Sequence, residues 1–232
     1  MLIESKVFNY YKKAYTKSFV SKDNLDICVM LSSGVDSVAL AHFICTNKKL
    51  VARLFSVKNV NVKLYHFNHN LRKQNDLMES KAIELAKFLD TEIIIKRADN
   101  DCSTEQKARE QRFKFFEDYD GVILTAHHIN DCVESYVMNV FRGHENRQPI
   151  PFFTAFHNAC IAHLLLFTEK KTLISYSNHY NLDKYVVEDE TNKVIKGSRR
   201  NLIRNKIIPL LSEENINLST VVRKKMLVKL TS

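Results

Sequence analysis

The sequence predicts an α/β protein built on a doubly wound parallel sheet, with helices on both faces of the sheet. Short apolar, β-prone segments at residues 26–31, 62–67 and 121–125 alternate with longer segments whose apolar residues recur at helical spacing. The first of these strands also runs into a cluster of small polar residues that comes directly before a helix. This order is typical of α/β domains that bind a ligand at the carboxyl ends of their strands.

The remaining elements follow from apolar spacing along the chain. Helical spacing predicts helices over residues 4–19, from residue 38 onward, over residues 76–89, 104–116 and 126–141, and a basic amphipathic tail over residues 218–230. Short apolar runs predict strands at residues 91–96 and 163–167, whereas residues 53–61 are expected to be a connection. Residues 152–162 carry no clear pattern. We expect one large domain over residues 1–211, with a first helix at 1–20, a helical and basic extension from about residue 150, and a short tail at 212–232.

Composition sets the broad class. A chain of 232 residues with 45% hydrophobic residues can bury a substantial core, and its formal net charge of +9 favours a polyanionic partner, nucleic acid ahead of a membrane surface. No apolar stretch approaches the roughly 20 residues that span a bilayer, so we expect no membrane partner. The five cysteines are scattered without a Cys-x-x-Cys pair, which argues against disulfide, zinc or iron–sulfur sites and favours a reducing cytoplasm.

The segment Ser32-Ser33-Gly34-Val35-Asp36-Ser37 is the main candidate for chemistry. A helix start presents unpaired backbone N–H groups, so a loop of serines and one glycine in front of it suits phosphate. Gly34 is expected to let the chain turn closely, and Asp36 is a candidate ligand for Mg²⁺ bridging phosphates. The alternative is an ordinary strand-to-helix turn capped by Asp36 or Ser37.

This segment resembles the Ser-Gly-Gly-x-Asp-Ser loop of the N-type ATP pyrophosphatases, the PP-loop superfamily. The resemblance implies a HUP-like, Rossmann-like fold and cleavage of ATP between its α- and β-phosphates. No Gly-Lys-Ser/Thr follows, which separates the loop from a Walker motif. Ser33 stands where that family has its first glycine, and we expect it to crowd the phosphate slightly.

Further segments are similar to one branch of that superfamily, the tRNA(Ile)-lysidine synthetases. Residues 66–72 are similar to His-Val-Asn-His-Gly-Leu-Arg, and residues 108–113 match Ala-Arg-x-x-Arg-Tyr except at Phe113. Residues 126–135 resemble Ala-His-His-x-Asp-Asp-Gln-x-Glu-Thr, with departures at Asn130, Cys132 and Ser135. Residues 187–192 and 199–209 are similar to the later Glu-Asp-x-Ser/Thr-Asn and Arg-Asn-x-Ile-Arg-x-x-Ile-x-Pro patterns.

The resemblance implies an enzyme, a ligase that forms a carbon–nitrogen bond. ATP and Mg²⁺ would serve to adenylate the wobble cytidine of an isoleucine tRNA with a CAU anticodon, and free L-lysine would then displace AMP. The sequence stops where many of these synthetases continue into extra C-terminal domains, so a short form is expected. A homodimer, the basic tail or a broader substrate range are the alternatives for how such a chain selects its tRNA.

The resemblance also assigns roles to matching positions. The expected ATP-binding residues are Ser32, Ser33, Gly34, Val35, Asp36, Ser37 and Arg109. The expected catalytic residues are Asp36, Arg109, Asp131 and Glu134, with Asp36 also at the metal. The expected lysine-binding residues are His127, Asp131 and Glu134. The expected tRNA-binding residues are Arg72, Arg112, Arg142, Arg199, Arg200 and Arg204.

Residue types alone leave alternatives open. Asp131 and Glu134, three apart on one helix face, suit an amine or a metal, but acidic residues also suit any helix N-terminus. One rival function is another PP-loop pyrophosphatase that adenylates a different nucleobase or small acid. A second rival is a catalytically degenerate RNA-binding protein.

Overall fold

The computed structural model describes residues 2–3, 8–9, 11–12, 23–70, 73–98, 107, 110–111, 114, 116–117, 119–188 and 198–231. Of the helix expected over residues 4–19, residues 8–9 and 11–12 are helical, and of that expected over 104–116, residues 107, 110–111 and 114 are helical. Arg72, Arg109 and Arg112 lie outside the described residues.

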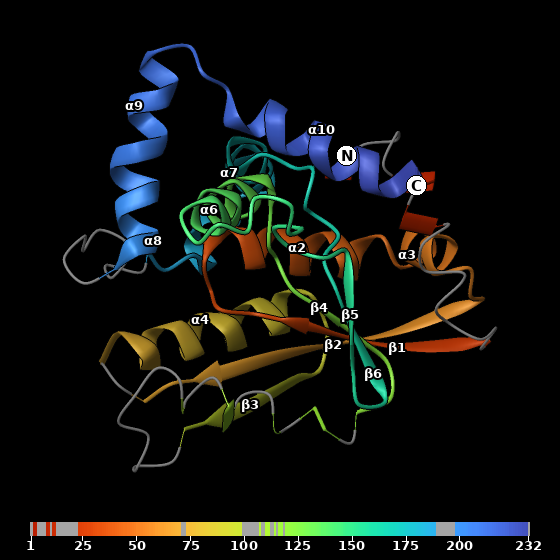
Figure 1. Cartoon of the computed structure of the whole chain (residues 1–232). Helices are drawn as coiled ribbons and strands as arrows, with labels where there is room; N and C mark the ends of the chain where they lie inside the picture. The colour runs from red at the N-terminus through yellow and green to blue at the C-terminus, as the bar shows by residue number, and fades with distance from the viewer. Residues whose placement is uncertain are drawn as a thin grey trace.

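A six-stranded sheet organises the chain (Figure 1). Its strands are β1 (Asn24–Met30), β2 (Asn59–Asn68), β3 (Ile93–Arg97), β4 (Val122–Leu124), β5 (Phe153–Phe156) and β6 (Ala159–Ala162), in the order β3-β2-β1-β4-β6-β5. Among the described strands, β5 alone runs antiparallel to its neighbour, and the other pairings are parallel. The carboxyl ends of β1 and β4 are therefore adjacent, since Val29 pairs with Leu124.

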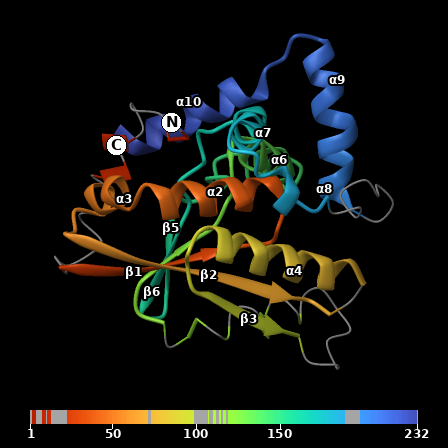
Figure 2. The same ribbon diagram turned by 180° about the vertical axis from the view of Figure 1, so that it is seen from behind.

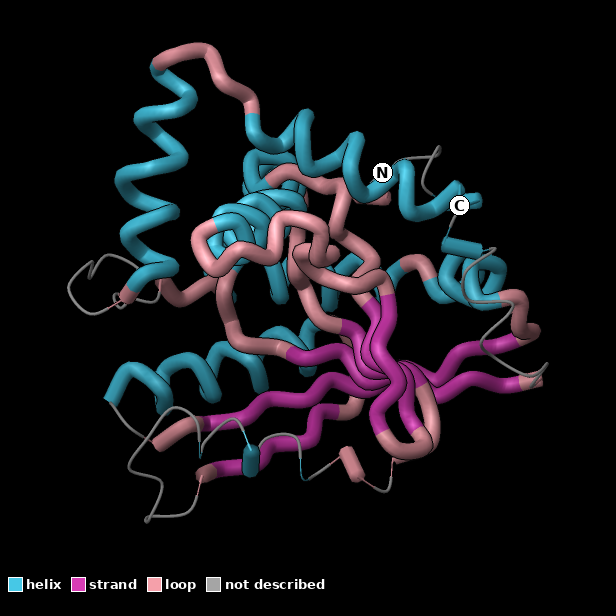
Figure 3. The backbone as a smooth tube through the Cα atoms, in the orientation of Figure 1, coloured by secondary structure: helices cyan, strands magenta, loops and turns pink. Residues whose placement is uncertain are grey.

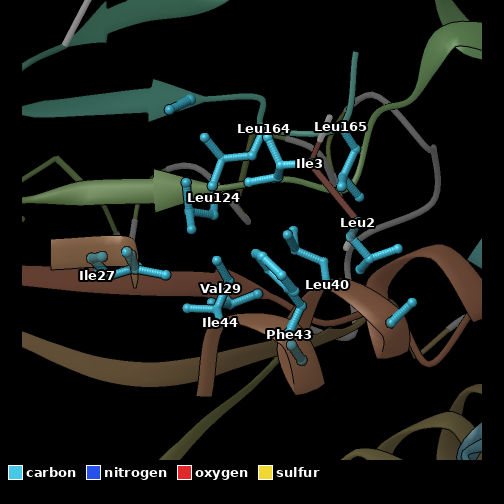
Figure 4. Close-up of a cluster of buried hydrophobic side chains, with 14 of the residues drawn as sticks. Leu2, Ile3, Ile27, Val29, Leu40, Phe43, Ile44, Leu124, Leu164 and Leu165 are labelled. Carbon is cyan, nitrogen blue, oxygen red and sulfur yellow. The ribbon is translucent and has the colours of Figure 1, made fainter. Parts of the chain in front are cut away.

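One face of the sheet carries the main core. Helices α2 (Val35–Thr46), α3 (Lys48–Phe55) and α4 (Lys73–Phe88) follow β1 and β2, and their apolar sides join the same buried cluster as those two strands. Beyond α2 lie α6 (Ile129–Val140), α7 (Lys170–His179) and, outermost, α10 (Leu218–Thr231), as the two opposite views in Figures 1 and 2 show. Figure 4 shows β1 and α2 meeting β4, the chain start and the segment after β6: Ile27, Val29, Leu40, Phe43, Ile44, Leu124, Leu2, Ile3, Leu164 and Leu165.

The opposite face carries a smaller core. Cys28, Tyr65 and Ile123 point to this side, because alternate residues of a strand face opposite sides of a sheet. Phe116 covers them, with its ring centroid 4.7 Å from that of Tyr65. The α/β class with helical segments flanking a mostly parallel sheet is confirmed.

Two local expectations were wrong. The strand expected at residues 163–167 lies earlier, at β6, and β5 and β6 form a hairpin from the residues left unassigned. The apolar run continues past the end of β6, so the sequence does not show where strand pairing ends. Leu164 to Phe167 are buried but do not belong to a strand. The connection expected at 53–61 contains the end of α3 and the start of β2.

The C-terminal part is helical. The 3₁₀ helix η1 (Asp183–Tyr185) leads back toward the first loop, where the Val187 amide donates to the Ser33 carbonyl over 2.8 Å. Helix α8 (Arg199–Leu202), the π-helical turn η3 (Ile203–Ile207) and α9 (Ile208–Glu213) form one rod, which Figure 3 shows standing beside the sheet domain. No helix among the described residues is long and apolar enough to cross a membrane.

Candidate active site

The carboxyl edge of the sheet brings together side chains from four separate parts of the chain. The loop after β1 carries Asp36 into the first turn of α2, and the loop after β4 leads into α6, which carries Asp131 and Glu134. The segment after β6 leads into α7, which begins at Lys170, and the α8–η3 rod adds Arg200 and Arg204. Parallel strands deliver their following loops to one edge, which explains why these residues meet.

Ser33 is the strained residue of the first loop. Its φ of 57° lies in the left-handed region, where non-glycine residues are uncommon. The side chain is fully buried, and its hydroxyl donates to the Met78 carbonyl of α4 over 2.6 Å. Because the hydroxyl is directed into the protein, it takes no room from the exposed face of the loop. This placement differs from the expectation that Ser33 narrows the phosphate site.

Gly34 has an ordinary backbone, with φ −76° and ψ 155°, so the sharp turn expected of it belongs to Ser33 instead. A Cβ built at Gly34 would meet only Ser32 Oγ, at an ordinary contact distance of 3.5 Å. Nothing in the described protein therefore requires a glycine here. The missing side chain leaves open space in front of the helix N-terminus, where the N–H groups of the first turn lack helical partners.

Replacing Gly34 by Ala is expected to separate ligand binding from folding. We expect the free energy of unfolding to change by no more than about 1 kcal/mol, the scale of an N-cap change, while the Kd for ATP rises at least about tenfold. Gly121→Ala is the contrasting control, because its Cβ would lie 2.4 Å from the Asp26 carbonyl oxygen. Urea unfolding and calorimetric ATP titration of both proteins measure the two effects. Unchanged ATP affinity in Gly34→Ala would show that phosphate does not approach this face.

Serine hydroxyls fix the rest of the loop. Ser37 Oγ accepts from the Ser32 amide over 3.1 Å and donates to the Gly34 carbonyl over 2.9 Å. The Ser32 and Ser37 hydroxyl oxygens also lie 3.1 Å apart. The loop is thus held in place by its own side chains, with Ser32 exposed and Ser37 buried.

Asp36 is the central anion of the site. Its Oδ2 lies 2.9 Å from Lys170 Nζ and 3.5 Å from His128 Nε2. Burial alone would raise the pKa of Asp36, but the hydrogen bond and charge of His128, followed by Lys170, hold the pKa below its usual value. Its other oxygen, Oδ1, is buried and has no hydrogen-bond partner among the described residues.

His128 connects this carboxylate to the next one. Its Nε2 lies 3.5 Å from Asp131 Oδ2, the same distance that separates it from Asp36 Oδ2. The same Asp131 oxygen accepts the His128 backbone N–H over 3.0 Å, which caps α6. Burial alone would raise the pKa of Asp131, but His128, His127 and Arg200 together lower it. Both carboxylates are therefore ionised at neutral pH.

Two arginines pair with the acidic residues of α6. Arg200 donates from NH2 to Asp131 Oδ1 over 2.7 Å and from Nε to Glu134 Oε2 over 2.6 Å. Arg204 donates to both oxygens of Glu134, from Nε over 2.6 Å and from NH2 over 3.0 Å. Burial alone would lower the pKa of Arg200, but Glu134 and then Asp131 raise it. The structure thus places two residues expected at tRNA directly on the pair expected at lysine.

The other expected residues lie farther out. Arg142 and Arg199 are exposed, as phosphate contacts require, but neither is part of this ion-pair group. The departures at Asn130 and Cys132 have structural explanations: Asn130 Oδ1 accepts the Lys170 amide over 3.0 Å, and Cys132 is buried in the core. Burial raises the pKa of the Cys132 thiol, which keeps it protonated.

Sequence reasoning assigned no role to His128 or Lys170. His128 had a signal, because it is the second histidine of the Ala-His-His segment and directly precedes α6. Lys170 lies 134 residues from Asp36 in the chain, so no local pattern connects the two residues.

A second polar cluster lies beside the acidic pair. The Thr125 hydroxyl lies 2.8 Å from His127 Nδ1 and 2.5 Å from His163 Nδ1, and these two nitrogens lie 3.3 Å apart. His163 is buried, whereas Thr125 and His127 are half-buried. Burial, followed by the charge of His127, lowers the pKa of His163 to about 3.

His163 is expected to make the fold sensitive to moderate acid. The unfolded chain binds a proton at this residue near pH 6.5, but the folded chain does so only near pH 3. The folded state therefore loses stability as pH falls through that window, by up to about 1.4 kcal/mol per pH unit. Chemical denaturation at pH values from 7 to 4 should show that the free energy of unfolding falls less steeply with pH in His163→Asn than in the wild type. His157→Asn, at an exposed position, should keep the wild-type slope.

The donor set fits a phosphate-bound Mg²⁺. Mg²⁺ in phosphate sites uses one or two carboxylates, with phosphates and water completing its shell. Asp36 supplies an ionised carboxylate whose buried Oδ1 has no partner in the described part of the chain, next to a loop shaped for phosphate. In the described ranges no group of three or more His, Cys, Asp or Glu side chains gathers as a metal site. A protein-only metal cage is therefore not what these residues form.

In this α/β domain the first strand of the sheet leads through a serine-rich loop to the N-terminus of α2, an arrangement suited to phosphate. The family model of the PP-loop domain matches residues 4–211, most of the chain. The chain therefore belongs to the PP-loop domain family, which implies that it binds ATP.

Similar proteins share the name of one enzyme. The chain is 28% identical over 228 residues to tRNA(Ile)-lysidine synthase of Clostridium perfringens, covering 93% of this chain and 45% of that protein. It is 29% identical over 209 residues to the enzyme of the same name from Staphylococcus aureus, covering 82% of this chain and 44% of that protein. The chain thus spans about half the length of the curated relatives it matches.

A solved structure supports the fold. The U34-tRNA thiolase NcsA from Methanococcus maripaludis, described with its [4Fe-4S] cluster, matches with a TM-score of 0.64 at 12% identity. The match covers 96% of this chain and 79% of that one.

Proposed function

We propose that this chain carries the catalytic domain of a tRNA(Ile)-lysidine synthetase. It would adenylate the wobble cytidine of an isoleucine tRNA with a CAU anticodon and then join free L-lysine to that base. The observation that carries the proposal is the link through His128, whose Nε2 lies 3.5 Å from both Asp36 and Asp131. This link supports the proposal, because it would set a phosphate site beside an amine site, as a reaction between an adenylate and an amine requires.

In the first step, the exocyclic oxygen of the cytidine would bond to the α-phosphorus of ATP while the bond to pyrophosphate breaks. The loop Ser32–Ser37 and the N-terminus of α2 would hold the departing phosphates. Lys170, 2.9 Å from Asp36, is a cation at the same position that can offset phosphate charge. Arg109 remains a candidate for the α-phosphate, on the resemblance of its segment alone.

Mg²⁺ would supply charge neutralisation of the phosphates when bound. Asp36 would hold it through the oxygen that has no hydrogen-bond partner in the described residues.

In the second step, the ε-nitrogen of lysine would bond to the activated ring carbon while the carbon–oxygen bond to AMP breaks. Only the neutral amine is nucleophilic, so the ammonium must first lose a proton. Asp131 and Glu134 would bind the ammonium, and His127 lies at the same end of α6 to accept the proton.

The arginine contacts add a condition to this step. Asp131 and Glu134 are already paired with Arg200 and Arg204, so an incoming ammonium must displace at least one guanidinium contact. A guanidinium released in this way can take a phosphate of the tRNA instead, since arginine binds carboxylate and phosphate with the same fork. Arg200 and Arg204 would therefore exchange an internal partner for RNA when both substrates are present.

The test uses the full chain with ATP, Mg²⁺, L-lysine and an unmodified isoleucine tRNA transcript. We expect AMP to form in proportion to tRNA, and nuclease digestion followed by mass spectrometry to reveal lysidine. A transcript with guanosine in place of the wobble cytidine is the control and should give neither product. AMP formation with another acceptor would point to a different pyrophosphatase, and RNA binding without AMP would point to a protein that has lost turnover.

A further inference from the structure

Thr125, His127 and His163 form a closed triangle of polar atoms. Thr125 is the residue after β4, His127 lies two residues later, and His163 is the residue after the neighbouring strand β6. Three distances define the triangle: 2.8 Å and 2.5 Å from the hydroxyl oxygen to the two Nδ1 atoms, and 3.3 Å between those atoms. Both rings thus turn the same nitrogen toward one hydroxyl.

Proton counting restricts the two rings. The Thr125 hydroxyl has one hydrogen to donate, and its oxygen has two lone pairs that can accept. Suppose that neither Nδ1 atom carried hydrogen. The hydroxyl could then donate to only one of them, and the second Nδ1 would meet only lone pairs, those of the oxygen and of the first Nδ1. If both carried hydrogen, the hydroxyl hydrogen would have no acceptor in the triangle. When both imidazoles are neutral, they are therefore in opposite tautomers.

The two distances favour one placement of the hydrogen. Hydrogen bonds donated by O–H are shorter than those donated by N–H, with ranges of about 2.5–3.0 Å and about 2.7–3.2 Å. The 2.5 Å separation fits a bond donated by the Thr125 hydroxyl to His163 Nδ1. The 2.8 Å separation fits a bond donated by His127 Nδ1 to the Thr125 oxygen. The low pKa of His163, about 3, agrees with a ring that remains an acceptor across the neutral range.

We propose that Thr125 and His163 are positioning residues that hold His127 in the tautomer with hydrogen on Nδ1, which makes its Nε2 a hydrogen-bond acceptor for the substrate amine. The identity of that amine as lysine rests on the proposed function, whereas the tautomer does not. His127 directly precedes the N-terminus of α6, which carries Asp131, and the charge of His127 lowers the pKa of Asp131.

The test reads the tautomer by NMR of the full chain with isotope-labelled histidine, the His127 signals being assigned from a His127→Gln protein. In the wild type we expect hydrogen on His127 Nδ1 and none on Nε2. His163→Asn should keep this state, because its amide oxygen can accept from Thr125. His163→Leu and Thr125→Val should lose it. Lysine-dependent AMP release should fall about tenfold in the Leu and Val proteins and recover to within about threefold of wild type in the Asn protein.

A wild-type His127 with hydrogen on Nε2 would overturn the proposal without any variant. An unchanged tautomer in both His163→Leu and Thr125→Val would overturn it as well. If the wild type shows the expected tautomer but has no lysine-dependent activity, the proposed function fails and the positioning role stands. Lysine-dependent AMP release near the wild-type rate in His163→Leu would likewise contradict the positioning role of His163, since leucine offers no hydrogen-bond acceptor.

Discussion

Asp36→Asn is expected to lower AMP release by at least about a hundredfold, the scale seen when one electrostatic contact of a transition state is removed. The side chain keeps its volume and can still face Lys170 and His128, but it loses the charge that both groups now surround. The amide is also a poorer ligand for Mg²⁺ than the carboxylate. Turnover measured with ATP, lysine and tRNA at saturating Mg²⁺ reports this loss.

The control for this substitution is Asp26→Asn. Asp26 lies on β1, ten residues earlier, where it is exposed and accepts a hydrogen bond from Asn61 over 3.0 Å. We expect wild-type turnover there, because Asp26 is remote from the carboxyl edge of the sheet. Equal turnover in Asp36→Asn and wild type would remove Asp36 from the chemistry and with it the assignment of the first loop.

Local sequence was sufficient for the parts of the site that local structure determines. The serine-rich loop and the Asp131–Glu134 spacing are contained within single strand–loop–helix units, so their placement at the sheet edge was predictable. The left-handed conformation of Ser33 was not predictable from the sequence, because the composition of the loop points to Gly34 as the residue that turns the chain. The burial of Ser33 and its hydrogen bond to Met78 depend on packing against α4.

Long-range pairing was the part that sequence could not supply. In the sequence, Arg200 and Arg204 look like RNA contacts in a basic segment. Tertiary structure shows that they pair with Asp131 and Glu134, which lie 69 and 70 residues earlier in the chain. The same holds for Lys170 on Asp36. Charge complementarity in sequence does not say which opposite charges meet, because each basic residue has many acidic candidates.

Glu134→Gln is expected to have the largest effect on stability among changes at this site. The Glu134 side chain is 3% exposed and accepts bonds from both Arg200 and Arg204. Losing the carboxylate leaves two guanidinium groups facing one amide, and breaking a buried pair costs about 3–5 kcal/mol. The arginines are 43% and 32% exposed, so water recovers part of that cost, and we expect a loss of about 2 kcal/mol in urea unfolding.

Two comparisons make this result specific. Glu169→Gln removes a carboxylate that pairs with Lys171 and Arg223 at the surface, and should change stability by less than about 0.5 kcal/mol. Arg200→Gln leaves Glu134 paired with Arg204, so it should lower the free energy of unfolding by less than Glu134→Gln does.

If Arg200 competes with the substrate amine for these carboxylates, Arg200→Gln should also lower the KM for lysine while weakening tRNA binding. A KM for lysine that rises in Arg200→Gln would mean that Arg200 holds the carboxylates in position for lysine instead of competing with it.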